Sequence, residues 1–476
     1  HRVERGSELS DIREKLSMIV GAEHVLTDEE SRERWSFDAI DPYRLMAHAH
    51  STDSRVDAVV RPAGTAEIAS VVRLANEINM PVIAYGGGTG VMGSVIPLSG
   101  GIAVDLGRMN RVLEIRRQDR LGVVQPGLVL ADFDAAAKRY GLQLGHDPWS
   151  VPIATVGGAI STDSVGYRAS KYGSMGEQVV AYEAVLGDGE IVRTRPLSRQ
   201  SSGPMLSRLF SGAEGTLAIL TEATVRLFPE PEARKFATVG FSSFEVAYPA
   251  AVRLFDIGLV PALLDITEED PPEGGHGFRA LLYLGFEGYR EEGDAQHARS
   301  LKEALALGGV DLGPQLTQEY WVMRHAVAER WRDQVKPLRP TDRWADWRWR
   351  SADYLHVSLP ISRVLDYKRF ADEVAFRHGL SLREIAIWTD PQLFSLFIID
   401  SDESAAEANQ PRLWVAVDEL LSGALAMGGG VEYCHGLGVK MDVWANLEWG
   451  DALKLAQRLK RAVDPNRVLN PGKLGL

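Results

Sequence analysis

The hydrophobic and polar positions along the chain predict two kinds of architecture, one on each side of about residue 235. Before it, Val56–Val60 is a short apolar run, and apolar residues then recur at helical spacing over 66–79. The chain becomes apolar again from Val82 and then runs into glycines. The pattern predicts strand, helix and strand, with Thr65 as the helix cap, an order typical of an α/β unit.

Three further patterns complete this first part. Residues 130–140 have helical spacing and are followed by Gly141, which predicts a helix. Residues 179–193 predict a β-hairpin, and residues 217–227 alternate as a strand does. Residues 147–176 are rich in small and hydroxyl residues and have little helical periodicity, so we expect a long loop. Loops of this length are usually functional or disordered.

After about residue 235, the patterns predict an α+β unit with an antiparallel sheet. The expected strands are 237–241, 280–286, 354–359 and 393–399, and the expected helices are 245–257, 292–307 and 362–378. A last helix is expected over about 447–463. The tryptophans gathered in this part favour a core, a pocket wall or a subunit contact; they are Trp321, Trp331, Trp344, Trp347 and Trp349.

The first glycine-rich segment, 81–106, is the strongest sign of a ligand. It predicts a strand, a loop starting at Gly86-Gly87-Gly88, and a second strand. Glycines let backbone N–H groups converge on an anion, and a diphosphate fits such a nest. Gly88, Gly90 and Gly93 match the spacing GxGxxG, but Pro97 interrupts the helix that this fingerprint needs. A loop without a ligand is the alternative.

His435 is the main candidate for acid–base chemistry. It lies between Cys434 and Gly436 in a glycine-flanked segment. Imidazole has an ordinary pKa near 6.5, which suits proton abstraction at neutral pH. A structural histidine is the alternative.

Composition and charge narrow the range of partners. The 476 residues have a net charge of −13, which argues against nucleic acid or an anionic membrane surface as the main partner. No apolar run is long enough to span a bilayer, and the first residues show no secretory pattern. The single cysteine, Cys434, excludes an intrachain disulfide and fits a reducing compartment, so we expect a cytoplasmic protein.

Six motifs, in their order along the chain, resemble those of a flavoprotein family. They are YGGGTGVMGS (85–94), DPWSVPIATVGGAIST (147–162), SGAEGTLAILTEATV (211–225), EYWVMRHAV (319–327), EYCHGLG (432–438) and NPGK (470–473). From Val56 to Leu476 the chain resembles the vanillyl-alcohol-oxidase-type, or PCMH-type, FAD-linked oxidases. Within them it is similar to the branch of glycolate oxidase FAD subunit, D-lactate dehydrogenase and alkyldihydroxyacetonephosphate synthase.

The resemblance implies an α+β fold, with a two-part PCMH-type FAD-binding domain and a cap domain whose antiparallel sheet is flanked by helices. It implies a helical lead-in over 1–50 and the FAD-binding domain over 51–232. The substrate or cap domain would span 233–440, and a segment over 441–476 would return to the FAD domain.

The resemblance also implies FAD as the cofactor. The residues that it places around FAD are Tyr85, Gly86, Gly87, Gly88, Thr89, Gly90, Pro148, Thr155, Gly157, Gly158, Ser161, Thr162, Gly166, Tyr172, Glu214, Gly215, Ile219 and Asn470. The histidine that anchors a covalent flavin is not evident in the first loop, so we expect non-covalent FAD. A bond between Cys434 and the flavin is the alternative.

For catalysis, the resemblance implies that His435 takes the hydroxyl proton of a substrate while a hydride passes to flavin N5. Arg324 would bind a substrate carboxylate, helped by Arg350 or Lys440, because the guanidinium fork matches a carboxylate. Tyr354 and His356 are further pocket candidates.

Two departures from the family pattern matter. The metal-using members carry a histidine-rich strand, and the corresponding stretch here, 387–398, has no histidine, so we expect no catalytic metal. Cys434 also stands where the hydroxy-acid dehydrogenases have glutamate before the histidine, and the synthase branch has a run of histidines there.

The leading interpretation is an FAD-dependent oxidoreductase acting on an alcohol or 2-hydroxy acid, with the tryptophans favouring a bulky or aromatic one. A flavin-dependent transferase or lyase of the synthase type, with no net redox, is one alternative. A flavoprotein electron-transfer subunit is another. The expected partners are a small-molecule substrate, oxygen or another electron acceptor, and a second copy of the chain in a homodimer.

Overall fold

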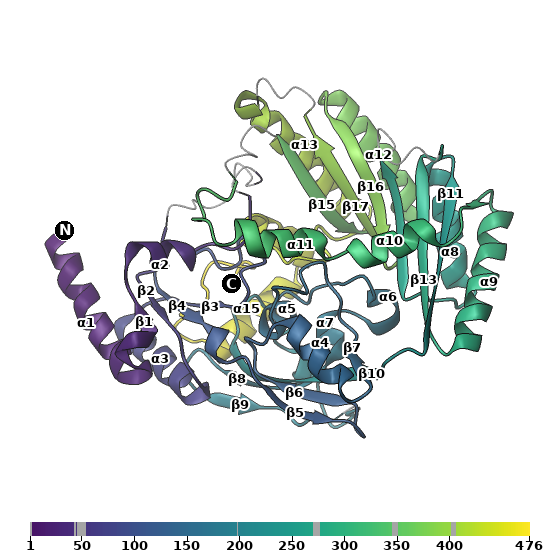
Figure 1. Ribbon diagram of the computed structural model, residues 1–476. Helices are drawn as coiled ribbons and strands as arrows, with labels where there is room; N and C mark the ends of the chain where they lie inside the picture. Colours follow the sequence, from purple (N-terminus) through teal and green to yellow (C-terminus); the bar gives the residue numbers. More distant parts are fainter. Residues whose placement is uncertain are drawn as a thin grey trace.

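The computed structural model describes residues 2–41, 44, 54–197, 199–269, 277–344, 351–400 and 406–476. Its strands form three sheets (Figure 1). Two sheets come from residues before 230 and lie in the lower half of Figure 1; the third comes from later residues and lies above and to the right of them. Helices α10 (Gln315–Met323) and α11 (Ala326–Arg330) cross between the third sheet and the other two.

The first sheet has the strand order β1 (Val25–Leu26), β2 (Ala58–Val60), β4 (Ile102–Asp105) and β3 (Val82–Tyr85). The strands β2, β4 and β3 are parallel. The predicted helix at 66–79 is confirmed as α3 (Thr65–Ile78), which buries its apolar side in one core with α1 (Arg2–Val20). The prediction that Thr65 caps this helix is wrong. Gly64 occupies that position, and the Thr65 hydroxyl donates instead to the buried Glu183 carboxylate.

The second sheet is antiparallel. Its order is β5 (Val112–Arg116), β6 (Leu121–Val124), β10 (Ile219–Pro229), β8 (Val179–Val185) and β9 (Ile191–Arg193), and β7 (Leu142–Leu144) also pairs with β10. The predicted hairpin is confirmed as β8 and β9. The predicted helix at 130–140 is α4 (Leu130–Lys138).

The expected loop at 147–176 instead contains short helices, which are α5 (Val156–Ser161), α6 (Ala169–Tyr172) and α7 (Met175–Gln178). None is long enough to complete two turns, so no helical periodicity can develop in the sequence. Side-chain caps define two of them. Thr155 accepts the N–H of Gly158 at the start of α5, and Ser174 forms a capping box with Glu177 at α7.

The third sheet has seven antiparallel strands. Their order is β14 (Val310–Asp311), β11 (Ala233–Phe241), β13 (Ala280–Gly288), β12 (Leu263–Glu269), β16 (Ser381–Trp388), β17 (Leu393–Ile399) and β15 (Ala352–Ser358). Helices α8 (Phe244–Asp256), α9 (Arg290–Ala306), α12 (Val364–Arg377) and α13 (Ala406–Ala426) pack against it. The predicted antiparallel α+β unit is confirmed.

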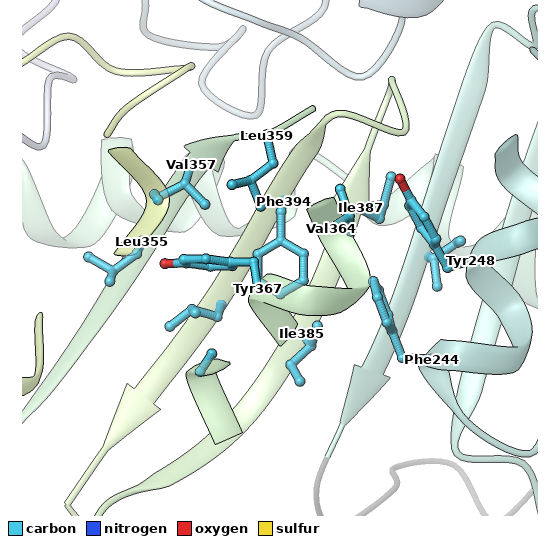
Figure 2. Packing of buried hydrophobic residues seen from close by; sticks show 14 of the residues in the cluster. Phe244, Tyr248, Leu355, Val357, Leu359, Val364, Tyr367, Ile385, Ile387 and Phe394 are labelled. Carbon is cyan, nitrogen blue, oxygen red and sulfur yellow. The ribbon is translucent and has the colours of Figure 1, made fainter. Parts of the chain in front are cut away.

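The alternation of side chains along this sheet gives it two different faces. Leu355 and Val357 of β15 and Phe394 of β17 point into the core beneath α12, where they meet Tyr367 (Figure 2). Residues between these core positions therefore face the other side. Tyr354 and His356 belong to that second set, which lies toward the first two sheets.

The C-terminal residues pack back onto the first sheet, where Leu469 bridges Val82 of β3. The helix expected over 447–463 is two helices, α14 (Ala445–Trp449) and α15 (Ala452–Val463), because Gly450 between them has φ +49° and ψ −125°. The remaining short helices are η1 (Ala22–His24), α2 (Glu29–Arg34), η3 (Leu106–Arg108), η4 (Leu206–Arg208), η5 (Trp331–Val335), η6 (Ile361–Arg363) and η8 (Asp442–Trp444). Over the described residues, no helix has both the length and the apolar character that a membrane span requires.

Candidate functional site

A cavity of about 590 Å³ lies where the three sheets meet. The glycine loop after β3, together with α5 and the turn before β10, lines what we call its glycine end; β15, Trp388 and residues 434–435 line its β15 end. Eighteen of the predicted site residues lie in its wall. They are Tyr85, Gly86, Gly87, Gly88, Thr89, Gly90, Pro148, Thr155, Gly157, Gly158, Ser161, Thr162, Gly166, Glu214, Gly215, Tyr354, His356 and His435.

The glycine end is formed by a strand, a loop and a strand, as predicted, because β3 and β4 are parallel neighbours. A Cβ atom on Gly86 would lie 2.5 Å from Thr155 Oγ1, and one on Gly87 would lie 2.5 Å from the Ile153 carbonyl oxygen. Gly88 has φ +65°, a conformation that favours glycine. Among the described residues, the N–H groups of 87–90 donate no hydrogen bond, so the loop offers free donors beside the cavity.

Asp38 fixes the far side of this loop, and sequence reasoning missed it. Its carboxylate accepts the N–H groups of Ile40 at 3.1 Å and Gly93 at 3.0 Å. Burial raises the pKa of Asp38 to about 7, although these hydrogen bonds oppose the rise.

Glu214 joins the glycine end to the segment that carries His435. Its carboxylate accepts the N–H groups of Leu437 at 2.7 Å and Gly438 at 3.0 Å, and the Ser94 hydroxyl at 2.5 Å. Asn470 does not line the cavity. Its amide donates to the carbonyl oxygens of Ser94 and Glu214, so it supports the same junction from behind. Ile219, also predicted, begins β10 of the second sheet and is buried in the hydrophobic core around the first sheet.

Two histidines lie together at the β15 end. The ring centroids of His356 and His435 are 4.6 Å apart. His356 Nδ1 shares a hydrogen bond of 2.8 Å with Ser395 Oγ, which shares another with the Tyr433 hydroxyl. Burial, followed by the positive charge of His435, holds the pKa of His356 well below its ordinary value, so this ring is neutral.

His435 has the opposite charge state. Burial alone would lower its pKa, but the Cys434 sulfur and the Glu432 carboxylate outweigh burial and raise the pKa to about 10. Its Nδ1 lies 3.3 Å from Glu432 Oε1, and its side chain is 31% exposed. The two rings therefore differ in charge at neutral pH, with His435 as an imidazolium.

Lys440 lies behind the cavity wall. Its side chain is fully buried, and its Nζ lies 2.6 and 2.7 Å from the two oxygens of Asp353. Burial lowers the pKa of Lys440 to about 8. Asp353 also accepts from Arg44 Nε at 2.8 Å, and Arg44 does line the cavity. The predicted Arg350 lies outside the described residues.

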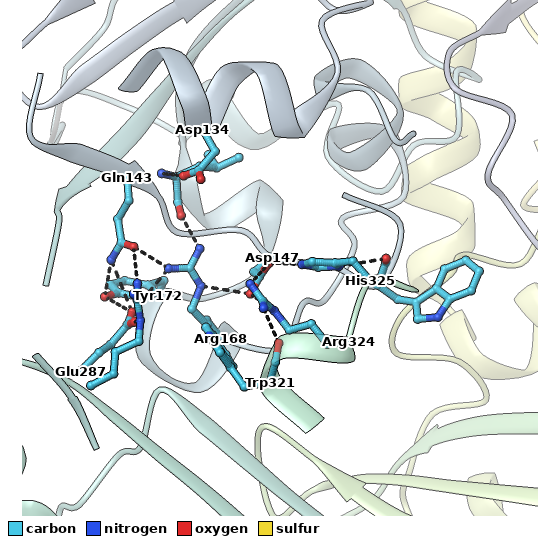
Figure 3. A network of polar contacts seen from close by, with 12 residues as sticks. Asp134, Gln143, Asp147, Arg168, Tyr172, Glu287, Trp321, Arg324 and His325 are labelled. Atoms are coloured by element: carbon cyan, nitrogen blue, oxygen red, sulfur yellow. Dashed lines mark hydrogen bonds and ion pairs between the residues drawn. The ribbon is translucent and has the colours of Figure 1, made fainter. Parts of the chain in front are cut away.

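Arg324 and Tyr172 lie in a different polar network (Figure 3). Arg324 Nε lies 3.0 Å from Asp147 Oδ2, and its guanidinium carbon is 3.9 Å from the centre of the Trp321 ring. It lines a separate cavity of about 420 Å³ beside α4. The Tyr172 hydroxyl donates to Glu287 at 2.6 Å. Neither predicted residue lines the larger cavity.

The cavity residues that sequence reasoning missed include Asp38, Arg44, Trp149, Tyr167 and Trp388. Trp149 lies within the motif at 147–162 and Tyr167 follows soon after it, so their neighbourhood gave a signal. Asp38 and Arg44 belong to the segment expected to be a helical lead-in, and no local pattern marks them. Over the described ranges, no group of three or more His, Cys, Asp or Glu side chains is arranged to hold a metal ion.

Comparison with known families gives two matches. A family model described as an FAD binding domain matches residues 56–195, and one described as FAD linked oxidases, C-terminal domain, matches residues 230–474. The chain is 28% identical over 481 residues to the glycolate oxidase subunit GlcD of Bacillus subtilis, covering 98% of this chain and 96% of that protein. It is 30% identical over 429 residues to a D-lactate dehydrogenase of Archaeoglobus fulgidus, covering 87% and 90%.

Solved structures show the same fold at lower identity. Substrate-bound p-cresol methylhydroxylase superposes with a TM-score of 0.78 at 19% identity, covering 99% of this chain and 97% of that one. An alkyldihydroxyacetonephosphate synthase superposes with a TM-score of 0.76 at 20% identity, covering 97% and 85%. The predicted fold class, family resemblance and FAD cofactor are confirmed.

The residues of the larger cavity fit FAD. Its volume of about 590 Å³ lies within the usual range for cofactor pockets. The glycine loop brings free N–H donors to the wall where a diphosphate would need them, and added Cβ atoms there would collide with the backbone or with Thr155. The hydroxyl groups of Thr155, Ser161 and Thr162 line the same end.

Proposed function

Because the chain belongs to the FAD-linked oxidases, we propose that it oxidises the CH–OH group of an alcohol or 2-hydroxy acid at the β15 end of its cavity. The main support is that His356 and His435 lie 4.6 Å apart in the wall of the cavity that also contains the glycine loop. FAD, when bound, supplies the electron acceptor for this chemistry. The protein's own side chains bind the substrate, orient it and take its proton.

His435 is the proposed general base. A base must first reach the proton, and the His435 side chain is 31% exposed, whereas His356 as a whole residue is only 5% exposed. Its Nδ1 side lies against Glu432, which orients the ring. Because its pKa is about 10, only a small fraction is neutral at pH 7, and the reaction should speed up as the pH rises.

Aromatic side chains support a bulky or aromatic substrate. Tyr167 and Trp388 stack with their ring centroids 6.0 Å apart, and both line the cavity. Tyr354 lines it too and is held by a hydrogen bond from its hydroxyl to Glu384. Such walls contribute large apolar contact area to a ring or a long chain.

The test is anaerobic mixing of the FAD-loaded protein with a panel of 2-hydroxy acids and aryl alcohols. The proposal predicts that at least one compound bleaches the visible absorbance of the flavin and leaves the corresponding carbonyl product. Turnover without net bleaching would favour the alternative of a transferase or lyase. No bleaching by any compound, with turnover only when a partner protein is added, would favour an electron-transfer subunit.

Three further features are proposed from the sequence. The electron acceptor is oxygen or another oxidant, the protein is cytoplasmic, and it forms a homodimer. Oxygen consumption compared with dye reduction tests the acceptor, cell fractionation tests the location, and light scattering tests the oligomeric state.

A further inference from the structure

We propose that Arg44 is the cation that binds a carboxylate or similar anionic group of the substrate. The inference rests on the proposed function and adds the charge of the substrate and the residue that recognises it. Among the lysines and arginines of the described chain, Arg44 is the one that lines the larger cavity, together with Tyr354, His356 and Trp388.

Two contacts hold Arg44 in place from behind. Its Nε donates to Asp353 Oδ1 at 2.8 Å, and its Nη2 donates to the Tyr354 carbonyl oxygen at 3.0 Å. Both partners belong to β15, so the guanidinium is fixed to the strand that carries Tyr354 and His356. A fixed guanidinium loses less conformational freedom on binding a ligand than a free one does.

Arg44 shares its carboxylate partner, Asp353, with a second cation. Asp353 carries one negative charge, and it lies against two cations, Arg44 and Lys440. Lys440 makes two close contacts with Asp353 and is fully buried, whereas the Arg44 side chain is 20% exposed. Among the described residues, Asp353 is the carboxylate that pairs with Arg44, and one carboxylate cannot neutralise two cations, so the excess positive charge lies on the side chain that faces the cavity. An anionic group on the ligand complements it.

The distribution of acidic side chains gives the cavity a direction. Within the described ranges, the acidic residues in its wall are Asp38 and Glu214, and both belong to the glycine end, where they are bound to backbone N–H groups. The β15 end carries Arg44 and the imidazolium of His435. A substrate with an anionic group would therefore bind with that group toward Arg44.

The arginine predicted from the sequence is less suited to this role. Arg324 is paired with Asp147, donates to the Trp321 carbonyl oxygen at 2.5 Å, and lines the other cavity. Asp147 also lies 3.4 Å from Arg168, which contacts the Glu287 carboxylate at 3.4 Å as well, so Arg324 belongs to a network that holds two carboxylates.

The test is a titration of the FAD-loaded protein with oxalate, followed by the perturbation of the flavin spectrum, with uncharged oxamide as the ligand control. Hydrogen bonds to charged groups are worth about 1.5–3 kcal/mol, so Arg44→Met should weaken oxalate binding roughly 10- to 150-fold. Arg44→Lys keeps the charge and should lose less. Arg234→Met is the matched control, since Arg234 is paired with buried Glu287 outside this cavity, and it should leave oxalate binding within about threefold.

Two results would overturn the inference. One is the absence of any oxalate-induced change in the wild-type protein. The other is Arg44→Met protein that retains its FAD and binds oxalate as tightly as the wild type. FAD content and the unfolding temperature of each variant separate lost recognition from lost structure.

The same variants separate this inference from the proposed function. If oxalate binding depends on Arg44 but no hydroxyl compound bleaches the flavin, the result would support the anion site and reject the oxidation. The converse result is that a hydroxy acid bleaches the flavin, but Arg44→Met lowers kcat/KM by the same factor for the acid and for its neutral amide. That result would support the oxidation and reject the role of Arg44.

Discussion

The Glu214 carboxylate accepts the N–H of Leu437 at 2.7 Å and thereby holds the segment that carries His435 against the glycine end of the cavity. A Cβ on Gly436 would overlap this carboxylate, so glycine allows the close approach. The sequence placed Glu214 beside the cofactor as a ligand. Its hydrogen bonds support a positioning role for it.

Glu214→Gln should therefore disturb the His435 segment. The neutral amide has one oxygen, which is a weaker acceptor than a carboxylate oxygen, and its NH2 group would face N–H or O–H donors that now bind the carboxylate. This change should cost about 2 kcal/mol of unfolding free energy. Urea unfolding measures the loss, and the rate of flavin reduction measures the displacement of His435. Ser94→Ala removes only one of the three hydrogen bonds to Glu214 and should lose less stability. Equal stability of Glu214→Gln and the wild type would contradict the positioning role of Glu214.

The pKa of His435 sets a pH dependence. Because an imidazolium cannot accept a proton, kcat/KM should rise with pH toward a pKa of about 10. The Cys434 sulfur contributes to the raised pKa, so Cys434→Ser should move the rising limb to lower pH. A pH–rate profile of the two proteins checks this. A limb that stays in place in Cys434→Ser, or that persists in His435→Asn, would assign the titration to another group.

Asp38 should make the protein less stable as the pH rises. Its pKa is about 7 in the folded protein against an ordinary 3.8, so the folded state binds more protons between these values. Stability is then greatest below about pH 4 and falls as the pH rises to about 7, by on the order of 4 kcal/mol from this group.

Asp38→Asn cannot lose a proton and should lack this decline. The comparison is the difference in unfolding temperature between wild type and Asp38→Asn across pH 4–8, since other carboxyl groups titrate equally in both. A difference that does not change with pH would contradict the raised pKa.

Arg324→Met should reduce stability more than substrate binding. Burial would raise the pKa of Asp147, but Arg168, His325 and Arg324 hold it well below its ordinary range, so Asp147 stays charged. Removing one partner of a buried ion pair costs about 3–5 kcal/mol, and the two remaining partners should reduce this to about 2. Urea unfolding and KM measured together check the claim; a rise in KM specific to acidic substrates would restore Arg324 as the carboxylate ligand.

Gly87→Ala should lose FAD. The added Cβ would lie 2.5 Å from a backbone oxygen, which cannot move aside as a flexible side chain can. An overlap that costs more than about 1.4 kcal/mol lowers affinity at least tenfold. Gly64→Ala is the matched control, because nothing lies within 4 Å of its added Cβ. FAD per protein in the purified variants gives the answer, and full FAD in Gly87→Ala would be the contrary result.

The parts of the structure that the sequence predicts well are those with local signals. The apolar spacing of residues 66–79 matches the period of a helix, and they form one. The glycine loop is recognisable because side chains larger than glycine would collide with its surroundings. The sequence patterns do not predict short helices such as α5, because capping rather than periodicity defines them.

The site itself depends on long-range pairing. Arg44 meets Asp353 across 309 positions of the sequence, and Arg324 meets Asp147 across 177. Nothing near either arginine in the sequence says which acid it will meet. The motif around Arg324 directed attention to it, while Arg44 carries no motif although it lines the cavity.

The most direct test of the account uses one compound that passes the anaerobic screen, prepared with hydrogen or deuterium on the carbon that bears the hydroxyl group. Oxidation at the β15 end predicts that each molecule of substrate bleaches one flavin, more slowly for the deuterated compound, and that His435→Asn bleaches more slowly still. Product formed with the flavin absorbance unchanged, or at the same rate for both isotopes and for His435→Asn, would contradict it.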